Sequence, residues 1–294
     1  MSIVLNIIYC NKNEYDTIGC HIEYYKNVLF KNFICNICFG YKNINYKSNN
    51  IFIIWRKWDE FTTIAKKYNE QNLKFGAIHV GHETFEPNKI NWYKYSSFII
   101  KKGFNEKYLS LPNVYYQPMG YKLDNINNNE IKKIIDKNIE KKYIYNYIGT
   151  TGGKDSFRGK DRYELINNFL KKDKREHVKI EICNNDKKFS SKEYYTILKK
   201  SIFTICPYGK NLETLRHWEA MECNSIPITK NAPFLEYLNN HPFIIVNDYS
   251  ELHMFFNNVT DEYIKSKQEE IQIWWENKKK DITNSYYQFI KTIL

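Results

Sequence analysis

The chain has 294 residues, of which 43% are hydrophobic and 17% aromatic, with only 11 Gly and 7 Pro. This composition excludes disorder, a collagen-like repeat and a low-complexity scaffold for the whole chain, and the length suffices for one large domain or two of about 100 to 150 residues. The formal net charge of +11 would attract anions such as nucleotides, nucleic acid, acidic glycans or anionic lipid, although an AT-rich genome would impose the same Lys-rich and Asn-rich bias whatever the function.

Short apolar or β-branched runs recur along the chain, and most are followed by longer mixed segments with helical spacing. In the first half these runs predict strands at 2–10, 36–41, 51–55, 75–81, 96–102 and 113–118. In the second half they predict strands at 143–149, 178–183, 202–207, 226–229 and 243–248. Alternation of strand and helix is typical of parallel sheets covered by helices, so the predicted class is α/β.

A polar, charge-rich stretch lies between the two halves and is the best candidate for a domain boundary. We therefore predict an N-terminal Rossmann-like lobe at 1–125, a linker at 126–141 and a C-terminal lobe at 142–260. The tail at 261–294 has no proline and carries apolar and aromatic residues at helical spacing, which predicts one or two helices that pack back on the lobes. Such a chain would be bilobed, with a cleft between two sheets.

The cysteines and the N-terminus bear on compartment and cofactors. The seven cysteines are scattered and mostly lie in apolar runs, which indicates buried thiols in a reducing compartment. Cys35 and Cys38 have the spacing of metal ligands, but no second pair completes a tetrahedral site, so no metal is predicted. The first residues lack the basic region of a signal peptide, and no stretch approaches the roughly 20 apolar residues of a membrane span. We expect a soluble, cytoplasmic protein.

The segment 202–233 reads as a strand, a turn, a helix and a second strand. Tyr208 and Gly209 fill the turn, and Asn211 is the predicted N-cap of a helix that ends near Cys223. The free N–H groups of that helix would point at the carboxyl edge of the strands. A helix N-terminus in this place is a ready phosphate site.

Arg216 and Glu219 are three residues apart on the predicted helix and so share a face. A guanidinium suits bidentate contact with phosphate, and a carboxylate suits the acceptance of two hydrogen bonds from ribose hydroxyls. The alternative is an intrahelical salt bridge on a solvated face. For an isolated Arg and Glu pair, that alternative would be favoured.

The run CPYGKNLETLRHWEAMECNSIPI (206–228), followed by the strand FIIVNDYSEL, resembles the C-terminal donor-binding motif of exostosin-like glycosyltransferases. FGAIHVGHETF and NVYYQPMGYK resemble two further segments of that family more loosely. The resemblance implies the GT-B architecture, with the sugar nucleotide on the C-terminal lobe and the acceptor on the N-terminal lobe. It further implies that Glu219 holds the ribose and that Arg216 neutralises the diphosphate.

A glycine-rich, basic loop follows the predicted strand that ends at Gly149, before a helix that starts near Lys160. It lacks the glycine and the Ser or Thr of a Walker A motif, so it is not a P-loop. The resemblance implies a loop that faces the pyrophosphate, with Arg158 as the main contact. Gly149 and Lys160 are assigned to the same nucleotide-binding loop. Tyr208 and Gly209 in the later turn are assigned to the same nucleotide site. The alternative is a solvated, flexible loop.

The segment HVGHETF supplies candidates for the general base that a sugar transfer with inversion requires. Glu83 occupies the position of the family's second acid and is preferred, while His82 replaces the first acid and is the other candidate. For His79, packing in a buried strand is favoured over catalysis.

These observations predict a glycosyltransferase that moves a sugar from a nucleoside diphosphate donor, with UDP favoured, to a glycan or glycoprotein acceptor. We expect it to be metal-independent, inverting, and without a resident cofactor, and to serve a pathogen or large virus with its own glycosylation machinery. This reasoning predicts a hexosyl- or pentosyltransferase and leaves the oligomeric state open. The alternatives are a basic nucleic-acid-binding protein, for which no recognised motif is present, and a glycan-binding module without catalysis.

Overall fold

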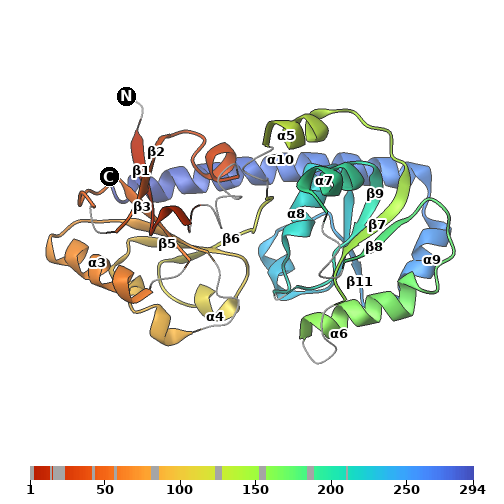
Figure 1. The fold of residues 1–294 in the computed structure, drawn as a ribbon, viewed down its shortest axis with the longest axis horizontal. Coiled ribbons are helices and arrows are strands. Elements are labelled where there is room, and N and C mark those ends of the chain that lie inside the picture. The colour runs from red at the N-terminus through yellow and green to blue at the C-terminus, as the bar shows by residue number, and fades with distance from the viewer. Residues whose placement is uncertain are drawn as a thin grey trace. The chain divides into compact units, whose positions relative to one another are not determined.

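The computed structural model describes residues 3–13, 15, 24–41, 44–55, 58–80, 86–122, 128–151, 157–183, 189–209 and 211–294, without the side chains of residues 128, 157 and 158. These residues form two compact units (Figure 1). The first unit comprises residues 1–119 together with 278–294, and the second comprises residues 120–277. The stretch predicted as a linker lies in the second unit and contains a helix, α5.

Among its described residues the first unit has a parallel sheet of six strands in the order β2-β1-β3-β4-β5-β6. The strands are β1 (Val4–Tyr9), β2 (Ile34–Phe39), β3 (Asn50–Ile54), β4 (Gly76–His79), β5 (Phe98–Lys102) and β6 (Val114–Gln117). The helices and helical turns are η2 (Tyr25–Leu29), α3 (Trp58–Glu70), η3 (Pro87–Lys89), η4 (Tyr93–Tyr95) and α4 (Glu106–Leu109). The six strands predicted for this half are confirmed.

The second unit has a parallel sheet of five described strands in the order β11-β10-β9-β7-β8. The strands are β7 (Tyr143–Gly149), β8 (Lys179–Ile182), β9 (Ser201–Ile205), β10 (Ile226–Lys230) and β11 (Ile244–Val246). The helices and helical turns are α5 (Asn128–Asp136), α6 (Phe157–Glu164), η5 (Leu165–Leu170), α7 (Ser191–Lys199), α8 (Leu215–Glu222), η6 (Pro233–Tyr237), α9 (Glu251–Asn258) and α10 (Asp261–Lys291). The five strands predicted for this half are confirmed as well.

Aromatic side chains fill much of the core of the first unit. Every residue of β3, β4 and β5 is buried, as expected for parallel strands with both faces covered. Phe52 of β3 packs against Phe61 of α3 and against Phe75, with ring centroids 4.9 and 5.5 Å apart. Trp92 is fully buried and meets Phe61 edge to face at 4.9 Å. Many aromatic residues of the N-terminal half are therefore accounted for by packing in this core.

Gly76 of β4 gives a direct test of this packing. A Cβ atom at Gly76 would lie 2.2 Å from the ring of Phe98, which is paired with Gly76 in the sheet and is itself only 2% exposed. We therefore expect Gly76→Ala to lower the free energy of unfolding by about 1 to 3 kcal/mol, the usual cost of overpacking. Urea unfolding followed by circular dichroism measures the loss. Adding Phe98→Leu should recover part of it, and an unchanged midpoint for the single variant would contradict the packing.

The tail forms one long helix, α10, within the one or two that the sequence predicts. Its first part belongs to the second unit, and its residues from Lys278 onward belong to the first. In the first unit, Phe289 stacks on Phe98 with centroids 5.6 Å apart and meets Tyr115 at 4.2 Å. The end of α10 therefore packs against strands β5 and β6 of this unit. Within the described ranges, no helix combines the length and apolar character that crossing a bilayer requires.

Candidate nucleotide-binding site

The candidate site lies at the carboxyl edge of the sheet in the second unit. Strands β7 and β9 are neighbours and run parallel, so their carboxyl ends meet at the same edge. Helix α8 follows β9 after the turn that contains Tyr208 and Gly209. Through this connection Gly149, at the end of β7, and Arg216, on the helix after β9, come close together, with a Cβ atom on Gly149 placed 3.2 Å from Arg216 Nη2.

The N-cap predicted for α8 is wrong by three residues. The backbone carbonyl of Asn211 accepts a hydrogen bond from the Gly209 amide at 2.8 Å, so Asn211 closes the preceding turn. The N-cap is Thr214, which is extended, and its backbone N–H donates to His217 Nδ1 at 3.1 Å. A buried histidine at the third helical position here does the work that Glu or Gln does in a capping box.

Arg216 points inward, toward β7. Its guanidinium donates to the backbone carbonyl of Ile148 and lies over the ring of Tyr147, 5.4 Å from the centroid. Its Nε has no hydrogen-bond partner among the described residues. Burial opposes the charge of Arg216, but the phenols of Tyr194 and Tyr147 outweigh burial and raise its pKa. The guanidinium is therefore a fixed cation with an unused donor.

Glu219 is 6% exposed and lies one turn further along α8. Among the residues that the structure describes, no ion pair joins it to Arg216. Instead the hydroxyl of Tyr194 on α7 donates to Glu219 Oε2 at 2.8 Å, and the charge of Arg216 also acts on that phenol. Burial raises the pKa of Glu219, although Tyr194, Arg216 and Lys122 pull it down. The salt bridge on a solvated face, which was the alternative for this pair, is not what the structure contains.

His217, between Arg216 and Glu219, stays neutral. It is fully buried, and burial lowers its pKa to about 4, with the charge of Arg216 acting in the same direction. Its ring stacks with Phe243 at 5.6 Å. His217 therefore belongs to the support of α8 and adds no positive charge near neutral pH.

Asp161 and Arg162 of α6 were not predicted as site residues, yet they hold the turn after β9 and the chain just after β7 in place. Asp161 Oδ2 accepts from the backbone N–H of Tyr208 at 2.8 Å, and the buried Arg162 donates to the Tyr208 carbonyl at 3.3 Å. Arg162 also donates to Thr150 Oγ1 at 2.7 Å, directly after β7. Lys230 of β10 pairs with Asp161 at 3.3 Å. Helix α6 thus ties the turn after β9 to the start of the glycine-rich loop.

The other residues predicted for nucleotide binding are placed as follows. A Cβ atom on Gly149 would lie 3.2 Å from Arg216 Nη2, so a glycine here leaves room for the guanidinium. A Cβ on Gly209 would lie 3.1 Å from Thr214 Cγ2, which fits a tight turn. The Tyr208 hydroxyl donates to the backbone carbonyl of Asn231 at 2.6 Å, while the Tyr208 backbone faces α6.

Lys160 is exposed on α6. The side chain of Arg158 lies outside the described residues, as do His82 and Glu83, the two candidates for the general base. His79, which ends β4, is fully buried and lies 2.5 Å from the Tyr93 hydroxyl through its Nδ1. Its predicted role in strand packing is confirmed.

Three of the cysteines, Cys10, Cys206 and Cys223, are buried free thiols, as predicted. Burial raises the pKa of Cys206 to about 12, so this thiol stays protonated beside the site. Cys35 and Cys38, on β2, are half-buried free thiols. In the described part of the chain no three His, Cys, Asp or Glu side chains gather in the way that a metal site needs.

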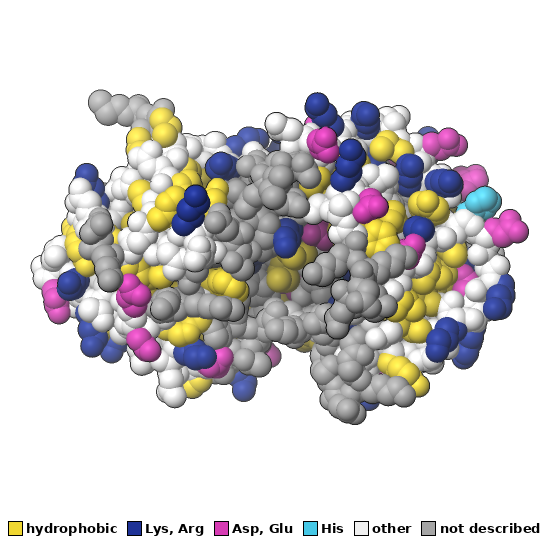
Figure 2. Space-filling model, in the orientation of Figure 1, with side chains coloured by type: hydrophobic (Ala, Val, Ile, Leu, Met, Phe, Trp, Pro, Cys, Tyr) yellow, Lys and Arg dark blue, Asp and Glu magenta, His cyan; other side chains and the backbone are white. Residues whose placement is uncertain are grey.

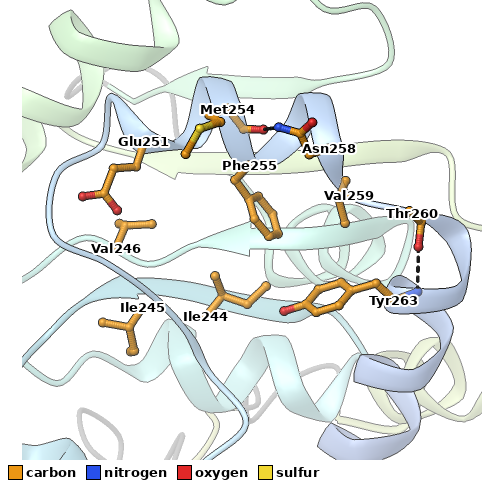
Figure 3. A pocket seen from close by; sticks show the side chains of 10 residues that line it. All are labelled: Ile244, Ile245, Val246, Glu251, Met254, Phe255, Asn258, Val259, Thr260 and Tyr263. Carbon is orange, nitrogen blue, oxygen red and sulfur yellow. Dashed lines mark hydrogen bonds between the residues drawn. The ribbon is translucent and has the colours of Figure 1, made fainter.

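A separate apolar pocket of about 660 Å³ lies in the same unit (Figure 3). It is lined by strand β11, helix α9 and the start of α10, through Ile244, Ile245, Val246, Glu251, Met254, Phe255, Asn258, Val259, Thr260 and Tyr263. It includes none of the residues predicted for nucleotide binding. Elsewhere on the visible face of the described residues, basic and acidic side chains are interspersed (Figure 2).

Comparison with solved structures supports the architecture. The structure of Anabaena HepE in complex with UDP matches with a TM-score of 0.55 and 9% identity, covering 99% of this chain and 100% of HepE. An α1,3-fucosyltransferase matches with a TM-score of 0.51 and 14% identity, covering 92% of this chain and 81% of that one. At these identities the likeness concerns the fold alone. The predicted fold class, α/β with two lobes of the GT-B type, is confirmed.

Sequence comparison adds the family. Ribitol-5-phosphate xylosyltransferase 1 of Danio rerio is 27% identical over 130 residues, covering 38% of this chain and 29% of that protein. This chain thus matches less than a third of the length of that relative. The model of the RXYLT1 C-terminal domain matches residues 125–294, which is more than half of the chain and includes the whole Arg216 and Glu219 region. The chain belongs to the family of the RXYLT1 C-terminal domain.

Proposed function

We propose that this chain is a glycosyltransferase that moves a sugar from a nucleoside diphosphate donor, preferably a UDP-sugar, to a glycan or glycosylated acceptor. Its family and its GT-B fold support the class of reaction. The name of the zebrafish relative makes xylose a first sugar to test, and the UDP bound to HepE makes UDP a first nucleotide. The resemblance to exostosin-like enzymes points to the same class.

The observation that carries this proposal is the inward-facing pair of Arg216 and Glu219, one turn apart on α8. Both side chains are withdrawn from solvent at the carboxyl edge of the sheet, where α/β folds bind nucleotides. The first is a cation whose Nε–H has no partner among the described residues, and the second is a carboxylate whose remaining lone pairs can accept from hydroxyl groups. A cation beside an acceptor of hydroxyl hydrogen bonds matches a diphosphate joined to a ribose.

The proposed chemistry follows from the charge that develops on the leaving group. When the bond between the sugar and the diphosphate breaks, negative charge collects on the phosphate oxygens. Arg216 and the positive end of α8 would stabilise that charge, so we propose a reaction that needs no metal ion. Glu219 would hold the ribose and keep the diphosphate in register with Arg216.

For the acceptor step we propose inversion, with Glu83 as the preferred base and His82 as the other candidate. One of these side chains would take the proton of the acceptor hydroxyl as that oxygen attacks the anomeric carbon. Both come a few residues after β4 (Gly76–His79) in the sequence. If Glu83 is the base, Glu83→Gln should lose sugar transfer but still bind the donor, while His82→Asn should keep transfer. The opposite result would identify His82 as the base.

The proposal predicts that UDP stabilises the protein without a metal ion. At 100 times its Kd, a ligand raises the free energy of unfolding by about 2.7 kcal/mol. We expect this gain from UDP and a UDP-sugar, with EDTA present or absent, and a smaller one from GDP, ADP or CMP. Thermal unfolding with each ligand measures it.

Two further ligands test the roles of the pair. Uridine lacks the diphosphate and should bind far more weakly than UDP, and dUDP lacks one ribose hydroxyl and should bind about tenfold more weakly. If no nucleotide stabilises the protein, the proposed function is wrong. If EDTA abolishes the gain, only the metal-independent form of the proposal is wrong.

A further inference from the structure

Helix α7 carries two adjacent tyrosines that reach toward Glu219 and its surroundings. The Tyr194 hydroxyl donates to Glu219 Oε2 at 2.8 Å. The Tyr195 hydroxyl donates to the backbone carbonyl of Lys122 at 2.6 Å. A capping box fixes the start of α7, since Glu193 N donates to Ser190 Oγ at 3.2 Å and Ser190 N donates to Glu193 Oε2 at 2.9 Å. Both phenols therefore project from a helix that is anchored independently of the site.

The carboxylate of Glu219 is held by these neighbours while part of its capacity stays open. Tyr194 occupies one of about four lone-pair positions, and the backbone amide of Lys122 also acts on the carboxylate. The positions that remain suffice for two ribose hydroxyls. Without the phenol, the side chain of Glu219 could turn about its flexible bonds and lose the orientation that a ribose requires.

We propose that Tyr194 is a positioning residue for the nucleotide, whose hydroxyl fixes the Glu219 carboxylate so that its free oxygen lone pairs meet the ribose. This inference rests on the proposed function of the site. Tyr194 itself need not touch the nucleotide or the reacting atoms. Its contribution is to binding of the ribose, a part of the donor remote from the bond that breaks.

Several charged or titratable groups interact electrostatically with Glu219, and of these Tyr194, Arg216 and Lys122 lower its pKa against the effect of burial. The groups are Tyr194 and Tyr195 of α7, Arg216 of α8, Lys122, and the thiols Cys206 and Cys223. The hydrogen bond from Tyr194 lowers the pKa of Glu219, so its removal would raise that pKa further above the usual value. Ionised Glu219 accepts from hydroxyls, and binding should weaken as the pH falls through this pKa. In a variant without the phenol, the same weakening should begin at a higher pH.

The test is Tyr194→Phe, with the Kd of UDP measured by calorimetry across pH and the kinetic constants measured with a UDP-sugar. We expect UDP to bind about tenfold more weakly near neutral pH, and the donor KM to rise by a similar factor with kcat nearly unchanged. The acid limb of the pH profile, which is the range where UDP binding weakens as the pH falls, should move to higher pH. Tyr145→Phe is the matched control. Tyr145 is a buried tyrosine of the same unit that donates to a different carboxylate, Asp173 Oδ2, at 2.6 Å, and its loss should leave UDP binding unchanged.

A double-mutant cycle that combines Tyr194→Phe with Glu219→Gln distinguishes an effect of Tyr194 through Glu219 from a general loss of structure. In that background the acid limb should vanish, and adding Tyr194→Phe should change UDP binding less than twofold. If Tyr194→Phe leaves both the Kd and the acid limb of the otherwise unaltered protein as they are, the inference about Tyr194 is wrong while the proposed function stands. If the unaltered protein itself binds no nucleotide, the proposed function fails first. A Tyr194→Phe effect that persists in full in the Glu219→Gln background would also overturn the inference.

Discussion

Arg216→Ala is expected to lower turnover about a hundredfold or more, the scale of losing one preorganised group that stabilises transition-state charge. Arg216 is a cation whose pKa is raised by the phenols around it, and its Nε is unpaired among the described residues. In the proposed mechanism it faces the phosphate oxygens of the leaving group, which gain negative charge as the bond breaks. Because that charge is larger in the transition state than in the bound donor, kcat should fall more than KM rises. Steady-state release of the nucleotide in the presence of acceptor measures both constants.

Arg175→Ala is a matched control for this prediction. Arg175 is also a half-buried arginine of the second unit, lies over an aromatic ring at 5.6 Å (Phe256) and donates to a backbone carbonyl at 3.0 Å (His253). It pairs with Asp173, and none of these contacts involves α8, so its loss should affect stability and leave turnover of the folded protein near normal. Arg216→Lys should recover only part of the activity, since an ammonium lacks the bidentate geometry. Unchanged turnover in Arg216→Ala would remove the assignment of this residue.

The strands were the most predictable part of the molecule. Runs such as IFII at 51–54 and YIYNYI at 143–148 are continuous and apolar because parallel strands are covered on both faces, and this pattern needs no knowledge of the tertiary structure. The shared helical face of Arg216 and Glu219 was predictable for a similar reason, whereas their assignment to a nucleotide came from the resemblance to exostosin-like enzymes. A spacing of three residues places both side chains on one face of any helix that contains them.

The contacts that complete the site could not be predicted, because they join residues far apart in the chain. Tyr194 is 25 residues from Glu219, and Asp161 is 47 from Tyr208. No local pattern distinguishes Tyr194 among the 25 tyrosines of the chain. The N-cap was misplaced for a local reason, since Asn211 suits both a turn and a cap, and only the extended backbone of Thr214 decides between them.

Trp218→Ala is expected to give the largest loss of stability in the second unit, about 3 to 5 kcal/mol in the free energy of unfolding. Trp218 is fully buried on α8, and its ring packs against Trp275 of α10 with centroids 5.3 Å apart. Its indole N–H donates to Glu213 Oε1 at 2.8 Å, and Glu213 is only 1% exposed. The substitution would therefore leave a cavity and also withdraw a donor from a buried carboxylate.

Urea unfolding followed by circular dichroism measures this loss, and Trp274→Ala provides the comparison. Trp274 is half-buried on α10 and donates to the backbone carbonyl of Asn239 at 3.0 Å, so it shares the indole and its hydrogen bond but not the full burial. Its removal should cost about 1 kcal/mol. If the two variants lose equal stability, burial of Trp218 between α8 and α10 does not hold α8 in place. The orientation of Arg216 and Glu219 would then have to come from their contacts with β7 and α7 alone.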